Sequence, residues 1–518
     1  MIYVILGQSA SGKTSLAISL AKRLSIPIIS ADAYQCYKKM NIATDKPDKE
    51  EVEGIDYQFY DCYDPSFYLS VFEFQKEGRK LLDKYLNEGK DVIVTGGTSF
   101  YIKALLYNYI FKDNVIEDDY ESRDLLTLQE MLKKRSLEVF SSIDSNNPRR
   151  VINALRQLDN SEDRFSILKE NDQKPIYPCR FFCIDIKKEE GNSLIDQRVE
   201  KMFEKGIVQE VRSLKEQYDF SLPAFKAIGY PEIDSYLKNE ITLEEAKQLI
   251  KVHTHQLAKK QRTFIRHQFV DVIFEKKEKI TSLIENDHLL KERTKIILKG
   301  DISKLEKISV LVAGLGGVGS IVASSLIRAG VKDIFLLDRD IVDITNLNRQ
   351  IMYSLDDLGV SKAQCCKNHL LKISPLAHIN TSEISFSSYK DVERKFTYII
   401  DCIDDVNGKA ELYLKSVNDR SKLFVSLGAG FHIDSTKVRI GKLKDCHSSF
   451  IKRYREELNN KGVEDRMIDE IDSVYFTDSR IKADRNEKRI GSFVSAVNSA
   501  GLALVTALIK DLIKGDMK

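Results

Sequence analysis

Apolar residues form short runs that are followed by stretches with helical apolar spacing, and this succession occurs near the start of each half of the chain. Residues 2–6 are an unbroken apolar run, and residues 16–24 carry apolar side chains at helical spacing. The same succession returns from residue 308, where a run at 308–313 precedes a second helical stretch. Unbroken apolar runs are typical of strands buried on both faces of a parallel sheet. The pattern therefore predicts an α/β protein with parallel sheets.

Further apolar runs supply the other strands that such sheets need. We predict strands at 26–30 and 91–95 in the first half and at 333–337 and 397–400 in the second half. Residues 67–74 are rich in aromatic side chains, which favours a place in the core.

The polar segment between the halves predicts a domain boundary. Residues 275–279 read Glu-Lys-Lys-Glu-Lys, and the sequence stays mostly polar, with helical tendencies, to about residue 300. A chain of 518 residues also exceeds the usual size of one domain. We predict domains at 1–272 and 301–518 and a charged linker at 273–300, with a short helical insertion at about 107–150 in the first domain.

The composition is typical of a globular protein, and the net charge by itself does not indicate nucleic acid as a partner. Hydrophobic residues make up 42% and charged residues 31%, and the net charge is only +2, so any basic surface must be local. Neither Cys179…Cys183 nor Cys365-Cys366 has a zinc spacing, which favours free thiols in a reducing cytosol. Met1 leads directly into a core strand and Ala500 to Ile509 is too short to span a bilayer, so we expect a cytoplasmic protein without leader or membrane partner.

The first strand and helix flank a glycine-rich segment of the phosphate-binding type. It reads Gly7-Gln8-Ser9-Ala10-Ser11-Gly12-Lys13-Thr14. Glycines allow the backbone amides to point at an anion, and the helix N-terminus adds partial positive charge. In such loops the lysine sits on the distal phosphates and the hydroxyl binds Mg²⁺. We therefore expect a diphosphate or triphosphate at this loop.

Polar residues at the ends of the next strands lie near this loop, because ligands bind at the carboxyl ends of parallel strands. Asp32 follows the strand at 26–30, where a carboxylate can hold a metal through water, act as a general base, or simply cap the next helix. The strand at 91–95 ends in Gly96-Gly97-Thr98 instead of the acidic residue usual in an ATPase. Two glycines there indicate close backbone approach to a ligand.

Ordered motifs over about residues 1–270 resemble the tRNA dimethylallyltransferase family. They are Gly7 to Thr14, Ser30 to Tyr37, Thr44 to Pro47, Asp64 to Ser66, Gly96 to Leu106, Asn147 to Leu155, Arg198 to Met202, Ala227 to Tyr230 and Thr254 to Gln261. The resemblance implies a P-loop NTPase-like fold. It also implies transfer of a dimethylallyl group from dimethylallyl diphosphate to the exocyclic amine of the adenosine 3′ of the tRNA anticodon.

The same resemblance implies roles for individual residues. Lys13, the loop amides and Mg²⁺ on Thr14 would hold the departing pyrophosphate. Asp32 matches the catalytic aspartate that orients the amine and takes its proton, and Thr98 matches the threonine beside the diphosphate. The diphosphate-binding residues would be Gly7, Ser9, Ala10, Ser11, Gly12, Lys13 and Thr14.

Basic residues recur at helical spacing on one face of a predicted helix that includes Lys247 to Arg266. Such charges usually form a solvated face, but within this resemblance they favour contact with the tRNA backbone. Three features depart from the family: the shortened insertion, Pro231, and His255 in place of arginine, and each affects tRNA affinity more than chemistry. The candidate tRNA-binding residues are Lys251, His255, Lys259, Arg262 and Arg266.

A second nucleotide fingerprint opens the second half. The run at 308–313 leads into Gly314-Leu315-Gly316-Gly317-Val318-Gly319, and Asp338 closes the next strand. Glycines at this spacing with an acid about twenty residues on form the dinucleotide-binding fingerprint. Taken alone, the fingerprint is compatible with an NAD-dependent dehydrogenase, although any adenosine ribose can use such an aspartate.

The residues that follow suit ATP and Mg²⁺ better than nicotinamide. Arg349 and Lys362 are cations and Asp404 is a strand-end acid, and together they would surround an adenosine pocket. Their alternative roles are surface salt bridges and a helix cap.

About residues 301–518 resemble the ThiF-like adenylating family that includes ubiquitin-activating, thiamin and molybdopterin enzymes, and within it the tRNA threonylcarbamoyladenosine dehydratases. The resemblance implies a Rossmann-like fold and adenylation of the threonylcarbamoyl carboxylate, followed by ring closure. Asp404 would hold Mg²⁺, while Arg349 and Lys362 would steady the ATP phosphates. Asp338 would bind ribose, and Asn346 and Gln350 would complete the pocket with Gly314, Gly316, Gly317 and Gly319.

The two halves together predict a bifunctional tRNA-modifying enzyme that acts on the anticodon-adjacent adenosine. Two alternatives for the second half stay open: adenylation of a small sulfur-carrier protein, and a nucleotide-binding module without catalysis. The small-residue helix with Ala496, Ala500, Ala503 and Ala507 favours a homodimer through the second domain.

Overall fold

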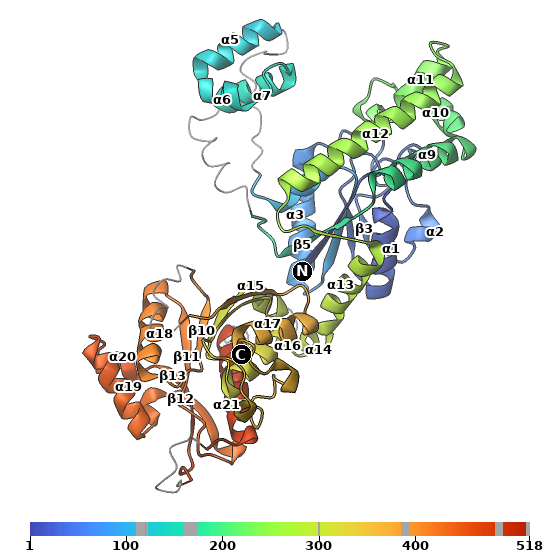
Figure 1. Ribbon diagram of the computed structural model, residues 1–518. Coiled ribbons are helices and arrows are strands. Elements are labelled where there is room, and N and C mark those ends of the chain that lie inside the picture. Colours follow the sequence, from blue (N-terminus) through green and yellow to red (C-terminus); the bar gives the residue numbers. More distant parts are fainter. Residues whose placement is uncertain are drawn as a thin grey trace. The chain divides into compact units, whose positions relative to one another are not determined.

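The chain folds into two compact units, each built on its own sheet (Figure 1). The computed structural model describes residues 1–109, 120, 123–159, 174–298, 301–384, 394–481 and 491–513. The first unit comprises Met1–Tyr85 and Lys90–Ile280, and the second comprises Leu86–Gly89 and Thr281–Lys518. The division between the units falls within the segment expected to be the linker.

The first unit contains a six-stranded parallel sheet of order β3-β2-β4-β1-β5-β6. Its strands are β1 (Ile2–Leu6), β2 (Ile28–Ser30), β3 (Tyr57–Gln58), β4 (Val92–Thr95), β5 (Cys179–Ile184) and β6 (Ile273–Glu275). Every residue of β1, β2 and β4 is buried, as expected of a parallel sheet covered on both faces. Because β1 lies between β4 and β5, the glycine loop after β1 lies at the middle of the carboxyl edge.

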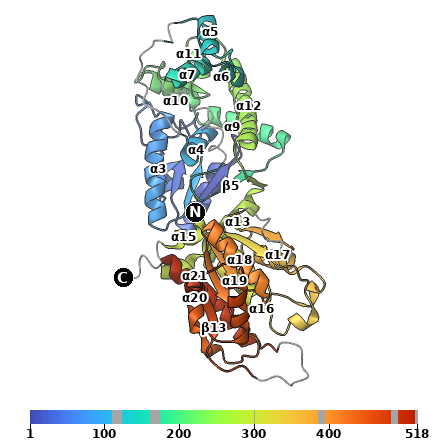
Figure 2. The same ribbon diagram turned by 90° about the vertical axis from the view of Figure 1, so that its left-hand side faces the viewer.

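Helices connect and cover these strands. They are α1 (Lys13–Leu24), α2 (Lys49–Val52), α3 (Val71–Asn87), α4 (Ser99–Leu106), α9 (Lys188–Glu204), α10 (Ile207–Lys215), α11 (Tyr230–Leu237) and α12 (Leu243–Gln268). Figure 2 shows α3 alongside the sheet. The long helix α12 begins with a capping box between Thr242 and Glu245. In the aromatic segment expected to be core, Phe74 is buried but Phe67 and Tyr68 are exposed, so that expectation is wrong for the turn before α3.

Three helices with a small core of their own begin within the predicted insertion, and the last of them extends beyond its expected end at about residue 150. These are α5 (Leu125–Arg135), α6 (Leu137–Ser142) and α7 (Pro148–Asp159). Leu128 and Leu132 of α5 pack with Val151 and Leu155 of α7. Residues 110–119 of the predicted insertion lie outside the described residues.

The segment expected to be a charged linker is mostly regular structure. It contributes β6, α13 (Lys277–Leu290) and α14 (Glu292–Leu298). Two of its charged residues form buried ion pairs within the second unit: Asp287 pairs with Lys332, and Lys291 pairs with Glu306. A charged sequence predicts exposure, and only these tertiary partners make burial of the charges possible.

The second unit contains a seven-stranded sheet of order β12-β13-β11-β10-β7-β8-β9, parallel except that β12 runs antiparallel to β13. Its strands are β7 (Ser309–Ala313), β8 (Asp333–Leu337), β9 (His378–Ser382), β10 (Tyr398–Asp401), β11 (Lys422–Ser426), β12 (Val438–Lys442) and β13 (Asp472–Phe476). The predicted α/β class with parallel sheets is confirmed in both units.

Alternate residues of these strands supply two separate cores. Val310 and Val312 of β7 join a core with α16 (Gly317–Ala329), α17 (Lys362–Ile373) and α21 (Val494–Ile513). Leu311 and Ala313 join another core with α18 (Val406–Asp419) and α19 (Ser449–Asn460). Figure 1 shows these two helix layers on opposite sides of the sheet. The remaining helices are α15 (Ile302–Lys307) and α20 (Asp465–Asp469).

Helix α21 is longer than the apolar stretch expected from the sequence. Its 20 residues make it long and apolar enough to cross a membrane by length and composition. However, Ala496, Ala500, Leu504 and Ala507 are buried, and the helix packs closely on α16. A Cβ on Gly501 would lie 2.7 Å from Val318 O of α16. The apolar composition thus serves the core, and these buried alanines are not available as the dimer contact expected from the sequence.

Replacing Leu504 with alanine should destabilise the second unit by about 3 kcal/mol, because it removes a fully buried side chain and leaves a cavity. Leu502→Ala on the same helix is the matched control. Leu502 is 52% exposed, so its truncation should cost no more than about 0.5 kcal/mol. Denaturant unfolding of the full chain measures both, and equal midpoint shifts would contradict the assigned burial.

Candidate active sites

The glycine loop of the first unit runs from the end of β1 to the first residue of α1. Gly12 has a φ of 79°, in the left-handed region that favours glycine, and Lys13 is the first helical residue. Lys13 is buried, and its Nζ lies 3.4 Å from the carbonyl oxygen of Gln8. Burial lowers the pKa of Lys13, and the negative charge of Asp32 opposes this shift. An anionic ligand bound at the loop would supply a negative charge that stabilises the charged form of the buried Lys13 side chain.

Asp32 is joined by hydrogen bonds to the loop that follows β4. One carboxylate oxygen accepts from the backbone amides of Tyr34 and Gln35 at 3.0 and 3.2 Å, and the other accepts from Gly97 N at 3.1 Å. Thr98 Oγ1 in turn accepts from Ala33 N at 3.0 Å. Asp32 therefore closes a turn, and not the helix N-terminus considered from the sequence. It also lies in the cavity described below.

Gln261 of α12 links the two loops, and sequence reasoning did not single it out as a site residue. Its side-chain oxygen accepts from Ser9 N at 2.7 Å, and its side-chain nitrogen donates to Gly97 O at 2.7 Å. Gln261 is buried. Its position in the motif Thr254 to Gln261 was the one signal available in the sequence. Its contacts with Ser9 and Gly97 span more than 160 residues of chain, and residue spacing does not predict contacts at that distance.

These loops form one wall of a cavity of about 680 Å³. Of the predicted first-unit residues, Ser9, Ala10, Gly12, Lys13, Thr14, Asp32 and Thr98 line it, whereas Gly7 and Ser11 do not. Five more cations line it: Lys22, Lys46, Arg198, Lys205 and Lys226. Asp32, Asp45, Asp48 and Glu51 also line it. The cations still outnumber the acidic residues, and this excess favours an anionic ligand. Arg198 and Asp45 both line the cavity, and Arg198 Nε lies 3.5 Å from Asp45 Oδ2.

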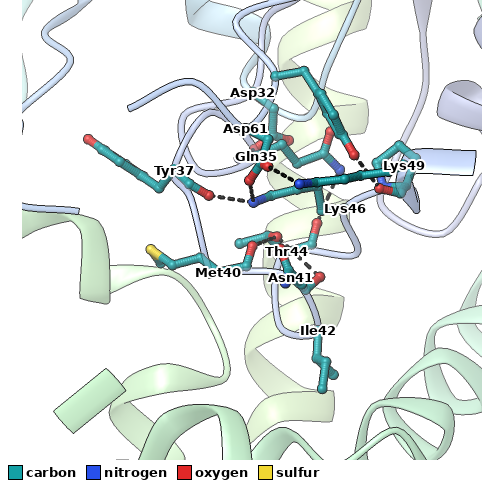
Figure 3. A network of polar contacts seen from close by, with 12 residues as sticks. Asp32, Gln35, Tyr37, Met40, Asn41, Ile42, Thr44, Lys46, Lys49 and Asp61 are labelled. Atoms are coloured by element: carbon teal, nitrogen blue, oxygen red, sulfur yellow. Dashed lines mark hydrogen bonds and ion pairs between the residues drawn. The ribbon is translucent and has the colours of Figure 1, made fainter. Parts of the chain in front are cut away.

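Lys46 fixes the loop that forms another wall of the cavity (Figure 3). Its Nζ donates to Tyr37 O and, at 2.7 Å, to Asp61 Oδ1. Burial lowers the pKa of Lys46, while the hydrogen bond that Lys46 donates to Asp61 raises it. Gln35 reaches the same loop, donating to Thr44 O at 3.1 Å. The motif Thr44 to Pro47 thus has a positioning role in this structure.

The predicted tRNA-binding residues of α12 have different surroundings. Lys251 pairs with Glu200 of α9 at 2.7 Å, and His255 lies 2.9 Å from Asp196 of α9. Arg262 donates to the side chain of Gln8. Lys259 and Arg266 are exposed. Ion pairs within the unit therefore engage the first part of the basic face, and the exposed cations lie toward the C-terminal end of the helix.

The glycine turn of the second unit is packed too closely for side chains. A Cβ on Gly319 would lie 1.7 Å from Gly314 O, and one on Gly314 would lie 2.9 Å from the carbonyl carbon of Cys402. Gly314 also has a φ of 84°. Because Cys402 follows β10, the carboxyl ends of β7 and β10 meet here, and Asp404 follows two residues later as an exposed side chain.

Asp338 and Lys362 lie beside this turn, and both are buried. Asp338 accepts from Leu315 N at 2.5 Å and from Asp340 N at 2.8 Å. Burial raises the pKa of Asp338 despite these bonds. Lys362 Nζ lies 3.2 Å from Asp340 Oδ2. The carboxylate predicted to bind ribose thus also holds the glycine turn.

Arg349 and Gln350 lie against the same turn from the segment after the short 3₁₀ turn η4 (Ile344–Asn346). A Cβ on Gly317 would be 3.5 Å from Arg349 Cγ, and one on Gly316 would be 3.7 Å from Gln350 Nε2. Arg349 donates to Thr345 O at 3.0 Å, and burial lowers its pKa. Gln350 Oε1 is buried and has no hydrogen-bond partner among the described residues. An unsatisfied buried oxygen at this position favours a ligand with hydrogen-bond donors.

A buried ion pair beneath the turn was not recognised from the sequence. Lys409 of α18 lies 3.0 Å from Asp401 Oδ1 and donates to Ser426 O at 2.8 Å. Burial raises the pKa of Asp401, and Lys409 opposes the shift. The pair connects the carboxyl ends of β10 and β11, which supports the loop that carries Asp404.

The architecture defines an enzyme class with a diphosphate-binding glycine loop in one unit and a Rossmann-type nucleotide fingerprint in the other. Residues 35–268 match the family IPP transferase, and residues 290–515 match the ThiF family. The chain is 38% identical over 276 residues to the tRNA dimethylallyltransferase of Acetivibrio thermocellus, a match that covers 51% of this chain and 88% of that protein. The chain belongs to the tRNA dimethylallyltransferase family through its N-terminal half, and its C-terminal half is a ThiF-family domain. Both resemblances inferred from the motifs are confirmed.

Solved structures also match each half. A tRNA delta(2)-isopentenylpyrophosphate transferase from Staphylococcus epidermidis is 32% identical, with 55% of this chain and 98% of that chain covered and a TM-score of 0.42. The E. coli tRNA N6-threonylcarbamoyladenosine dehydratase is 25% identical, with 43% of this chain and 93% of that chain covered and a TM-score of 0.41.

Gln261→Leu should weaken binding of inorganic pyrophosphate to the first unit about tenfold. The change leaves the amide of Ser9 and the carbonyl of Gly97 without their partner, at a cost of about 1–3 kcal/mol. Gln256→Leu, on an exposed position of α12, should leave binding unchanged. Isothermal titration of both variants measures the difference, and equal affinities would contradict the bridging role.

Proposed function

We propose that the first unit transfers a dimethylallyl group from dimethylallyl diphosphate to the exocyclic amine of the adenosine 3′ of the tRNA anticodon. Family membership supports the reaction, and the observation that carries it is the single cationic cavity shared by Lys13, Asp32 and Thr98. An allylic diphosphate ionises toward a carbocation, so stabilising the departing pyrophosphate is the main catalytic demand.

Residues of the cavity divide this work. Lys13 and the loop amides bind the pyrophosphate, and Thr98 lies beside it. Asp32 orients the amine and takes its proton, held in place by its bonds to Gly97 and the turn. The target base leaves the anticodon stack to enter the cavity, and Lys259 and Arg266 contact the tRNA backbone from α12.

The cavity also fits Mg²⁺. The Thr14 hydroxyl and the Asp32 carboxylate line it together, and both are the hard oxygen donors that this ion prefers. Bound through Thr14, Mg²⁺ would supply charge neutralisation for the diphosphate.

Asp32→Asn should lower prenyl transfer at least about 100-fold, because the amide cannot accept the proton of the amine. Pyrophosphate should still bind the variant, since Lys13 and the loop are unchanged. Asp219→Asn, on an exposed turn of the same unit, is the control. Transfer of labelled dimethylallyl to an anticodon stem-loop measures the rates, and retention of activity in Asp32→Asn would contradict the role.

We propose that the second unit uses ATP to adenylate the carboxylate of threonylcarbamoyladenosine at the same tRNA position. Adenylation releases pyrophosphate, and AMP is a far better leaving group than hydroxide. The neighbouring urea can therefore attack the activated carboxyl carbon and close a ring, with release of AMP and a proton. The ThiF-family match supports adenylation, and the buried, unsatisfied Gln350 Oε1 beside the glycine turn supports a nucleotide there.

In this proposal the residues around the turn hold the nucleotide. Arg349 and Lys362 steady the phosphates, and Asp338 and Asn346 bind the ribose side of the pocket. The exposed Asp404 carboxylate is an oxygen donor that fits Mg²⁺ on the leaving pyrophosphate. One amine cannot carry both modifications. The two activities therefore act on different tRNAs, in each case at the adenosine 3′ of the anticodon. A homodimer through the second unit remains a prediction.

Arg349→Ala should lower ATP–pyrophosphate exchange at least about 100-fold, and exchange should require tRNA that carries threonylcarbamoyladenosine. Arg328→Ala, an exposed arginine of α16, is the control. Exchange that depends on a small carrier protein instead would support the sulfur-carrier alternative. No exchange in the unaltered protein, together with an unchanged tRNA modification profile in Arg349→Ala cells, would support a non-catalytic module.

A further inference from the structure

Three potential metal ligands to which no role is assigned above converge in the second unit. They are Asp357 of the 3₁₀ turn η5 (Leu355–Asp357) and Cys365 and His369 of α17. One ligand atom from each lies within 4.8 Å of the other two. Asp357 Oδ1 is 3.0 Å from His369 Nε2. Such separations match the spacing of donor atoms around one small cation.

Local structure explains why the three side chains meet. Cys365 and His369 are four residues apart and therefore share one face of α17. Asp357 is oriented by Ser354, whose backbone amide and hydroxyl donate to Asp357 Oδ2 at 2.7 and 2.9 Å. Hydrogen bonds of this kind orient a ligating carboxylate from behind.

We propose that Asp357, Cys365 and His369 form a zinc site, with water as the fourth ligand. A thiolate, an imidazole and a carboxylate are all established zinc donors. Cys365 is buried, while the His369 side chain is 30% exposed. The cluster is therefore anchored in the core but open to solvent on one side, as entry of an ion and a water ligand requires.

Cys365 would bind zinc as the thiolate. Zinc binding replaces the thiol proton, which is released to solvent, and no redox step is involved.

The site also has a structural consequence for the nucleotide pocket. Residue 357 lies in the segment between Gln350 and Lys362, two residues assigned to that pocket. A metal bound to both η5 and α17 would fasten this segment to the helix that begins at Lys362. We assign the metal a stabilising role, without contact to the reacting groups.

No zinc signature was recognisable in the sequence because the spacing is unusual. The donors are eight and four residues apart, and one is a carboxylate, which differs from paired cysteine motifs. The convergence depends on the fold of η5 against α17. A hydrogen-bonded trio that never binds metal is the alternative explanation of the same contacts.

Zinc titration of the full chain tests the proposal. Reduced, chelator-treated protein is titrated with Zn²⁺ against a chromophoric competitor, and the variants Cys365→Ser, His369→Gln and Asp357→Asn are compared with it. Each variant should lose one equivalent of bound zinc or bind it at least about tenfold more weakly. Cobalt substitution should give a thiolate-to-metal charge-transfer band that Cys365→Ser abolishes.

Two controls replace other potential ligands. Cys62→Ser and His378→Gln change exposed residues outside the cluster and should retain the zinc equivalent and the cobalt band. Circular dichroism establishes that each variant is folded, and the three ligand variants provide independent readings if one is not. No zinc binding by the unaltered protein, or equal binding by all variants, would overturn the proposal without affecting the proposed tRNA chemistry.

Discussion

Both sites depend on how closely two backbone segments approach at the carboxyl edge of a parallel sheet. In the first unit, a Cβ on Gly96 would lie 2.2 Å from the carbonyl of Ala31, so the ends of β4 and β2 meet only because residue 96 is glycine. In the second unit, Gly319 allows a similarly close approach, because a Cβ at this position would lie 1.7 Å from Gly314 O. Close approach brings Asp32 to Gly97 and Cys402 to Gly314.

Buried polar groups then fix the loops that the sheets bring together. Gln261 joins Ser9 to Gly97, Lys46 joins Tyr37 to Asp61, and Lys409 joins Asp401 to Ser426. Each of these groups is costly to leave unpaired away from water, so each restricts its loop to one arrangement. The loops can therefore hold a charged ligand without having to be ordered by it, which is the condition for electrostatic stabilisation of a leaving pyrophosphate.

The positions of the glycine turns, the strands around them and the acids at strand ends were predictable, because each follows from local spacing. Lys13, Asp32 and Thr98 were identified in this way, and the structure brings them to one cavity. Gly7 and Ser11 do not line that cavity, because they support the loop from behind; a Cβ on Gly7 would lie 2.5 Å from Ser11 Oγ. The basic face of α12 was also predictable as a pattern, but not the pairing of Lys251 and His255 with α9.

The two α/β folds and their order could be predicted from local patterns, since apolar periodicity and glycine spacing are local properties of the chain. The ordered motifs carried the resemblance to the two families. Tertiary structure alone decided which polar residues meet: Gln261 with Ser9, Lys332 with Asp287, and His369 with Asp357. It also decided that the charged segment after residue 273 is ordered and that α21 lies in the core. Burial strengthens a polar contact and raises the free-energy cost of leaving its partners unpaired, and burial depends on residues that are distant in the chain.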